Sequence, residues 1–135
     1  MPSTLNPDEL IIRALVDKLK ESSFKVMLGY SAAGLSELEP PAILVQLDSM
    51  KETDRQNKRA KYTLELTVSS VTRTDSDTTY NLMNMVHVIR SLLNESGSIH
   101  SGIRKINFSD TQFDIAPSNG QLSFADMSVN INAVF

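Results

Sequence analysis

Residues 61–69 alternate strictly between polar and apolar side chains, and no other feature of the sequence constrains the fold as strongly. Tyr62, Leu64, Leu66 and Val68 fall on one side of an extended chain, with polar residues between them. A period of two predicts a β-strand with one buried face and one solvated face. Such a strand needs antiparallel partners and a second layer over its apolar side. We therefore expect a sheet with helices packed on one face.

Further segments have the composition of strands that could complete this sheet. These segments are residues 24–30, 42–50, 103–115 and 121–135. Ser118–Gly120 predicts a hairpin turn before the last strand, because Asn and Gly tolerate the positive φ angles of tight turns. Leu122 and Phe124 are out of phase with the alternation that follows them, so we expect a bulge near Ala125.

Two segments combine helix-start signals with apolar residues at three- and four-residue spacing. In the first, Asn6 is placed to cap the helix through its side chain, and Pro7 suits the first helical position. We expect helices over residues 6–21 and 76–94, the second capped from within 74–76. Their predicted apolar faces comprise Ile11, Ile12, Leu15, Val16 and Leu19, and then Tyr80, Leu82, Met83, Val86, Ile89, Leu92 and Leu93.

The order of these parts predicts an α+β fold, α-β-β-β-α-β-β, with both helices on one face of a mainly antiparallel sheet. The 135 residues match the length of one domain, so we expect a single domain over residues 1–135. No apolar run reaches the ~18 residues of a membrane span, and we expect no membrane partner.

Residues suited to catalysis or cofactor binding are few. The chain lacks cysteine, and His87 and His100 belong to no recognisable motif. Asp75 and Asp77 lack the spacing of a calcium loop and are better explained by helix capping. A Ser–His–Asp grouping stays open, because triads are defined by geometry, but no G-x-S-x-G turn presents a serine. We expect no enzyme activity, no cofactor and no metal.

The segment Lys51–Lys61 is the one anomaly of charge. It carries a net charge of +3 in a chain of net charge −3, so the remaining residues sum to −6. It joins two predicted strands and is longer than a usual hairpin loop, so we expect a long charged loop. The loop is either a solvated arm or an arm that docks on an acidic surface of another copy or partner; nucleic acid is a weaker option without interleaved aromatics. The candidate interface residues are Lys51, Arg55, Lys58, Arg59 and Lys61.

The succession of these parts resembles the tail terminator (tail completion) proteins of long-tailed bacteriophages and phage-like tails. The resemblance covers nearly the whole chain and lies in the order of the segments. The matching stretches are ELIIRALVDKLKESSFKV (Glu9–Val26), LSELEPPAILVQL (Leu35–Leu47), KYTLELTVSSVTRT (Lys61–Thr74), YNLMNMVHVIRSLL (Tyr80–Leu93) and NGQLSFADMSVNI (Asn119–Ile131).

The resemblance implies a structural virion protein, assembled in the host cytoplasm and located at the tail and neck. Members of the family form a ring, usually of six copies, that ends tail-tube polymerisation and provides the docking surface for the head. The implied partners are other copies, the tail tube protein, a neck or head-completion protein and, in contractile tails, the sheath protein. DNA only passes through the lumen. The implied contact region includes residues 51–61, and there are no catalytic residues to carry over. The alternatives are another head–tail joining, neck or tube protein, or a small ligand-binding α+β domain.

Overall fold

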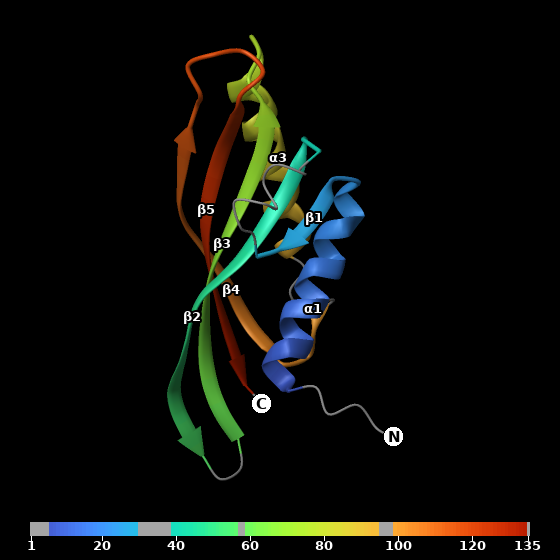
Figure 1. Ribbon diagram of the computed structural model, residues 1–135. Helices are drawn as coiled ribbons and strands as arrows, with labels where there is room; N and C mark the ends of the chain where they lie inside the picture. Colours follow the sequence, from blue (N-terminus) through green and yellow to red (C-terminus); the bar gives the residue numbers. More distant parts are fainter. Residues whose placement is uncertain (1–5, 30–38, 57–58, 95–98, 135) are drawn as a thin grey trace.

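The computed structural model describes residues 6–29, 39–56, 59–94 and 99–134 (Figure 1). The described elements follow the predicted order, with a short 3-10 helix added after the first α-helix. They are α1 (Pro7–Leu19), η1 (Lys20–Ser22), β1 (Lys25–Leu28), β2 (Ala42–Gln56), β3 (Arg59–Arg73), α3 (Thr78–Leu93), β4 (Ile103–Asp114) and β5 (Leu122–Val134).

Five strands form one twisted sheet in the order β1-β2-β3-β5-β4 (Figure 1). β1 pairs with β2 in parallel, and the other three pairs are antiparallel. Residues of α1 and α3 belong to the same core cluster as one face of β3 and β5, so both helices cover that face. The predicted α+β class and the placement of the helices are confirmed. No helix in the described part of the chain is long and apolar enough to cross a membrane.

The alternation on β3 has the predicted effect. Leu64, Leu66 and Val68 are buried on the helix-covered face and lie opposite alternate residues of β5. The helix residues predicted to pack there are in the same cluster and fully or nearly fully buried. They are Ile12, Leu15, Leu19, Val86, Ile89 and Leu93.

The bulge expected near Ala125 does not exist. β5 pairs with β3 without a register shift from Leu122 to Val134. Leu122 and Phe124 instead pack on the opposite, helix-free face, against a small buried cluster of Ala42, Leu44 and Val71. The sheet is therefore apolar on both faces at this end, which explains why the apolar residues change sides along β5.

The helices differ from the prediction in their ends and in part of one face. Asn6 precedes α1, but its side chain makes no capping hydrogen bond in the described structure. On α3, Tyr80 is 73% exposed and Met83 is also exposed, whereas Thr78 and Met85 are buried. A buried stripe at 78, 82, 85, 86, 89 and 93 follows the helical period more closely than the predicted set.

Candidate functional site

The predicted long loop is a continuation of two strands. β2 extends to Gln56 and β3 begins at Arg59, so only residues 57–58 connect them. The ladder continues to the tip through the pairs Asp54–Lys61, Arg55–Ala60 and Gln56–Arg59. The pairing of β3 with β5 extends from Arg73 to Lys61, so the end of the hairpin, residues 55–56 and 59–60, extends past the described part of β5 (Figure 1). The charged segment is thus a two-stranded arm, and the expectation of a long loop is corrected.

The structure distributes the five candidate basic residues along this arm. Lys51 and Arg55 lie in β2, and Arg59 and Lys61 lie in β3. Lys58 falls outside the described residues. Lys51 forms an exposed ion pair with Glu65 at 3.5 Å, so its charge is partly matched within the chain.

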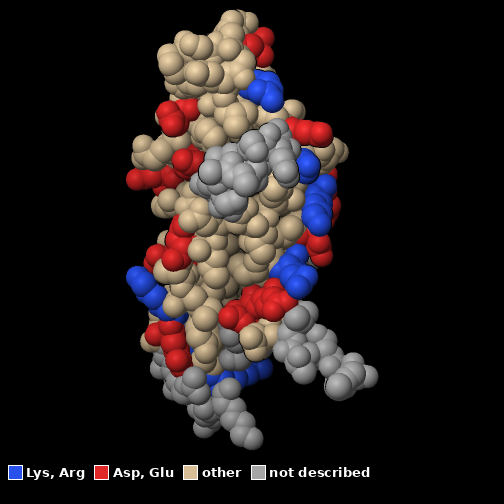
Figure 2. All heavy atoms as spheres, in the orientation of Figure 1, with Lys and Arg blue, Asp and Glu red and all other residues tan. Residues whose placement is uncertain are grey.

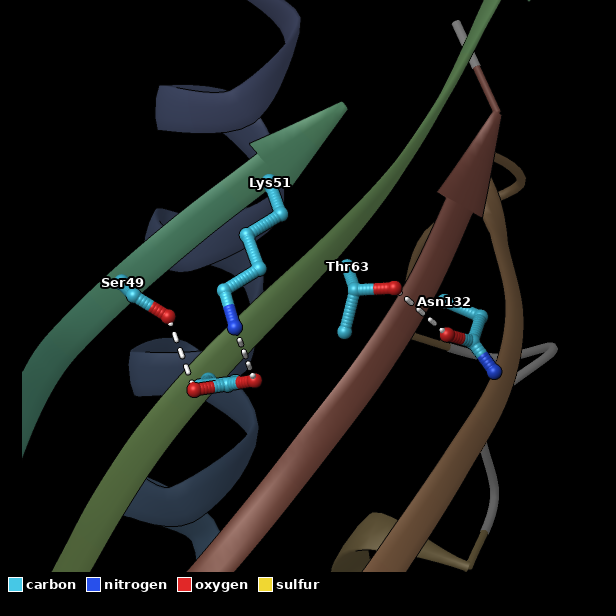
Figure 3. Close-up of polar contacts among 5 residues, drawn as sticks. Ser49, Lys51, Thr63 and Asn132 are labelled. Atoms are coloured by element: carbon cyan, nitrogen blue, oxygen red, sulfur yellow. Dashed lines mark hydrogen bonds and ion pairs between the residues drawn. The ribbon is translucent and has the colours of Figure 1, made fainter. Parts of the chain in front are cut away.

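Glu65 organises the polar, helix-free face at the base of the arm (Figure 3). Its carboxylate accepts a hydrogen bond of 2.8 Å from the Ser49 hydroxyl and one of 3.5 Å from Lys51 Nζ. The hydrogen bond from Ser49 and, second, the charge of Lys51 lower the pKa of Glu65 below its ordinary value. Both partners come from β2, so this contact ties the arm's outer strand to β3.

A register shift interrupts β2 between Leu47 and Ser49. The extra residue, Asp48, accepts a 2.6 Å hydrogen bond from the Thr67 hydroxyl on β3. Ser49, the residue that follows, is held by Glu65. The bulge is therefore fixed by side chains on both sides of the shift, and it is a defined feature of the edge strand.

The polar face continues from β3 onto β5. The Thr63 hydroxyl donates a hydrogen bond of 3.2 Å to Asn132 Oδ1 (Figure 3). The Ser69 hydroxyl donates one of 2.6 Å to Asp126 Oδ1. In Figure 2, charged side chains lie along both sides of the molecule, with an acidic group in the lower middle of the view. The polar face combines hydroxyl and amide groups with the charged side chains of Lys51, Glu65 and Asp126, which suits contact with water or a polar surface.

The residues considered for catalysis either make local structural contacts or lie on separate elements. His100 accepts a 2.9 Å hydrogen bond from the Gly102 N–H through Nδ1, and His87 is exposed on α3. Asp75 accepts the Asp77 N–H at 2.8 Å in the turn before α3. Among the described residues, no group of three or more metal-ligating side chains comes together.

Sequence reasoning did not identify the groove between the start of α1 and the edge of β2. The groove has a volume of about 470 Å³ and is lined by Asp8, Glu9 and Ile12 of α1 and by Leu28, Leu47 and Leu64 of the sheet, with three further residues. Leu47 is 44% exposed and Met50 is 46% exposed beside it. An apolar run does not show where its neighbouring strand ends, so the exposure of these two residues could not be predicted from the sequence.

Comparison of the sequence with protein-family models and with curated proteins finds no match.

Proposed function

We propose that the protein is a structural virion protein, a tail terminator that forms a ring on the head-proximal end of a phage tail tube. In this role it stops tube polymerisation and forms the docking surface for the head or neck. Its partners are other copies of itself (six per ring in most of the family it resembles), the tail tube protein, a neck protein and, in a contractile tail, the sheath protein. It acts in the virion, after assembly in the host cytoplasm.

The observation that carries the proposal is the projecting β2–β3 arm. It has a net charge of +3, whereas the rest of the chain sums to −6. An arm that extends past the sheet can reach a neighbouring subunit, which the long loop of the prediction was also expected to do. Opposite charges on different surfaces of one chain favour head-to-tail contacts, and such contacts close into rings.

The start of α1 supplies an acidic surface for such a contact. Asp8 and Glu9 lie in its first turn, where the helix dipole favours negative charge. Acidic atoms gather over this end of α1 in Figure 2. Glu9 is paired with Arg13 at 2.8 Å, and the pair is exposed. The basic arm and this acidic helix end are distinct surfaces of opposite charge on one chain, which favours head-to-tail contacts between copies.

Electron micrographs and native mass measurements of the purified protein test the proposal, alone and mixed with tail tubes of the same phage. We expect rings with a central hole that bind one end of each tube. Rings that bind along tubes or only to heads would favour another joining, neck or tube protein. Compact single copies that bind no tube would overturn the proposal and favour a small ligand-binding domain.

A further inference from the structure

Two edges of the sheet have no strand partner within the described part of the chain. β1 covers β2 only from Ala42 to Val45, so the outer edge of β2 is open from Gln46 onward. β4 is the last strand on the opposite side, and its outer edge is open along Ile103–Asp114. Open edges present unpaired N–H and C=O groups, which readily pair with another chain.

The directions of the two edge strands suit pairing between copies. Each of the pairs β2–β3, β3–β5 and β5–β4 is antiparallel, so β2 and β4 run in opposite directions. When two copies stand side by side in the same orientation, β4 of one can form an antiparallel ladder with β2 of the other. A contact between two different surfaces is heterologous, and its repetition around an axis forms a ring when the rotation between copies closes.

The levels of the side chains along the sheet also match. Two residues are at the same level of the sheet when successive strand pairs connect them. Phe108 is connected in this way through β5 to Leu66, which pairs with Leu47. By the same route, Ile106 is at the level of Leu64, opposite Met50. Phe108 and Ile106 pack at the margin of the helix-covered core. A neighbouring copy at the same level would therefore place Phe108 beside Leu47 and Ile106 beside Met50.

Charges near the two edges are complementary. Asp8 and Asp48 lie by the β2 edge, at the start of α1 and in the bulge, and Glu9 beside Asp8 is paired with Arg13 in its own chain. The corresponding part of β4 has basic neighbours, namely Arg90, Arg104 and Lys105, and the Arg90 guanidinium lies 5.2 Å from the centre of the Phe108 ring.

One pair of like charges falls at the same level. Lys51 and Lys105 are both at the level of Thr63. The Lys51 charge is matched by Glu65 within its own chain, so this pair does not cancel the attraction of the others.

We propose that copies of this chain assemble edge to edge, with the first half of β4 from one copy added as an antiparallel strand to β2 of the next. The inference rests on the proposed function for the closed ring, and it names the surfaces that hold the ring together. The ladder begins where β1 ends, and it buries the apolar side chains that a single copy leaves exposed on β2.

The absence of cysteine permits a direct test by disulfide trapping. Ser49 and Asn107 are both at the level of Glu65 on the polar face, so the ladder would set them opposite each other. Directly opposed residues of an antiparallel pair lie within the Cα separations of 4.4–6.8 Å that disulfides accept. Oxidised S49C/N107C protein should give a series of covalent multimers on a non-reducing denaturing gel. S49C and N107C alone should remain single copies.

A displaced cysteine provides the matched control. Gln112 is exposed on the same strand, but it is at the level of Ser69, well away from Ser49. S49C/Q112C should give no multimers under identical oxidation. Multimers of both double variants to the same extent would indicate random collision and would overturn the proposal, as would a covalent dimer of S49C alone, which requires β2 to pair with β2.

The outcomes separate this inference from the proposed function. If native mass shows rings but S49C/N107C forms no multimers, edge pairing is wrong and the ring proposal stands. If the multimers form but the assembly binds no tail tube, edge pairing stands and the terminator role is wrong. Single copies in native mass together with absent multimers overturn edge pairing outright.

Discussion

At the level of single residues, the polar face of the sheet is organised by Glu65. Its carboxylate accepts hydrogen bonds from Ser49 and Lys51 of β2, and these contacts lower its pKa. A carboxyl whose pKa is lower in the folded state adds stability above the unfolded-state pKa, and this stability is lost as the pH falls through the folded-state pKa. The arm's attachment should therefore weaken at acidic pH and not at alkaline pH.

Replacement of Ser49 tests this arrangement. In S49A the pKa of Glu65 should rise toward its ordinary value, because the largest cause of the shift is removed. Lys51→Met should raise it less. A pH titration of the side-chain carboxyl by NMR measures both changes. A Glu65 pKa that is unaffected by S49A would contradict the assigned hydrogen bond.

Leu66 is the residue on which the assigned register depends most. It is 1% exposed and lies in the main core. Leu66→Ala should lower the free energy of unfolding by about 2–5 kcal/mol, because it removes buried methyl groups and leaves a cavity. Urea unfolding measures the loss. Leu28→Ala serves as the matched control, since Leu28 is exposed at 58% and should cost far less.

At the level of elements, α1 and α3 begin in different ways. Asn6 has the expected residue type for a cap but makes no side-chain capping bond in the described structure. Before α3, the Thr78 hydroxyl accepts the Asp75 N–H at 2.6 Å and donates to the Asp75 carbonyl at 2.9 Å. The start of α3 is therefore held by a buried reciprocal contact, and the start of α1 is not.

This difference predicts unequal effects of two substitutions. Thr78→Val should lower the free energy of unfolding by about 1–3 kcal/mol, because the buried Thr78 hydroxyl loses both of its hydrogen bonds to the Asp75 backbone. Asn6→Ala should cost well under the ~1 kcal/mol typical of a lost side-chain cap. Thermal and urea unfolding of both variants compare the costs. An Asn6→Ala loss that equals the Thr78→Val loss would contradict the assigned contacts.

The elements also show what the sequence could and could not predict. The spacing of apolar residues in the sequence correctly predicted β3 and most of the buried faces of both helices. Burial on one side of an element leaves such a periodic pattern. The arm at 51–61 has only one apolar side chain, so no apolar period marks it as strand, and its pairing depends on backbone hydrogen bonds. In β5, Leu122 and Phe124 pack against a second small core on the other face of the sheet. The prediction assumed that only one face of the sheet is buried, so it missed this core.

At the level of the whole molecule, one chain carries two surfaces of opposite charge. The basic arm projects from one end, and the acidic start of α1 lies beside the open edge of β2 (Figures 1 and 2). Edge pairing would hold neighbouring copies side by side, and the arm would be free to reach the adjoining ring or tube. The two contacts are separable, so substitutions in one should spare the other.

Charge reversal on the arm tests its role in docking. R55E/K58E/R59E should keep the fold and weaken assembly with the tube or neighbour, although one exposed ion pair contributes only about 0–1 kcal/mol. In the proposed ring the contact repeats, so the triple change would act at every interface. High salt should mimic it, since exposed charges are screened beyond ~8–10 Å. Sedimentation and tube binding measure the effect.

A triple reversal elsewhere provides the control for charge alone. K20E/K25E/R73E changes the net charge by the same amount at exposed positions away from the arm and from the first turn of α1. It should leave tube binding nearly unchanged. Equal losses in both triple variants would assign the effect to net charge, and normal binding by the arm variant would make the arm a solvated extension with no docking role.

The most direct measurement of the proposed terminator role is the length distribution of phage tails that assemble when the gene for this chain is removed. The account predicts tails of uncontrolled length without attached heads, and restoration of uniform, headed tails when the wild-type chain is supplied. Tails of normal length joined to heads in the absence of the chain would contradict the account.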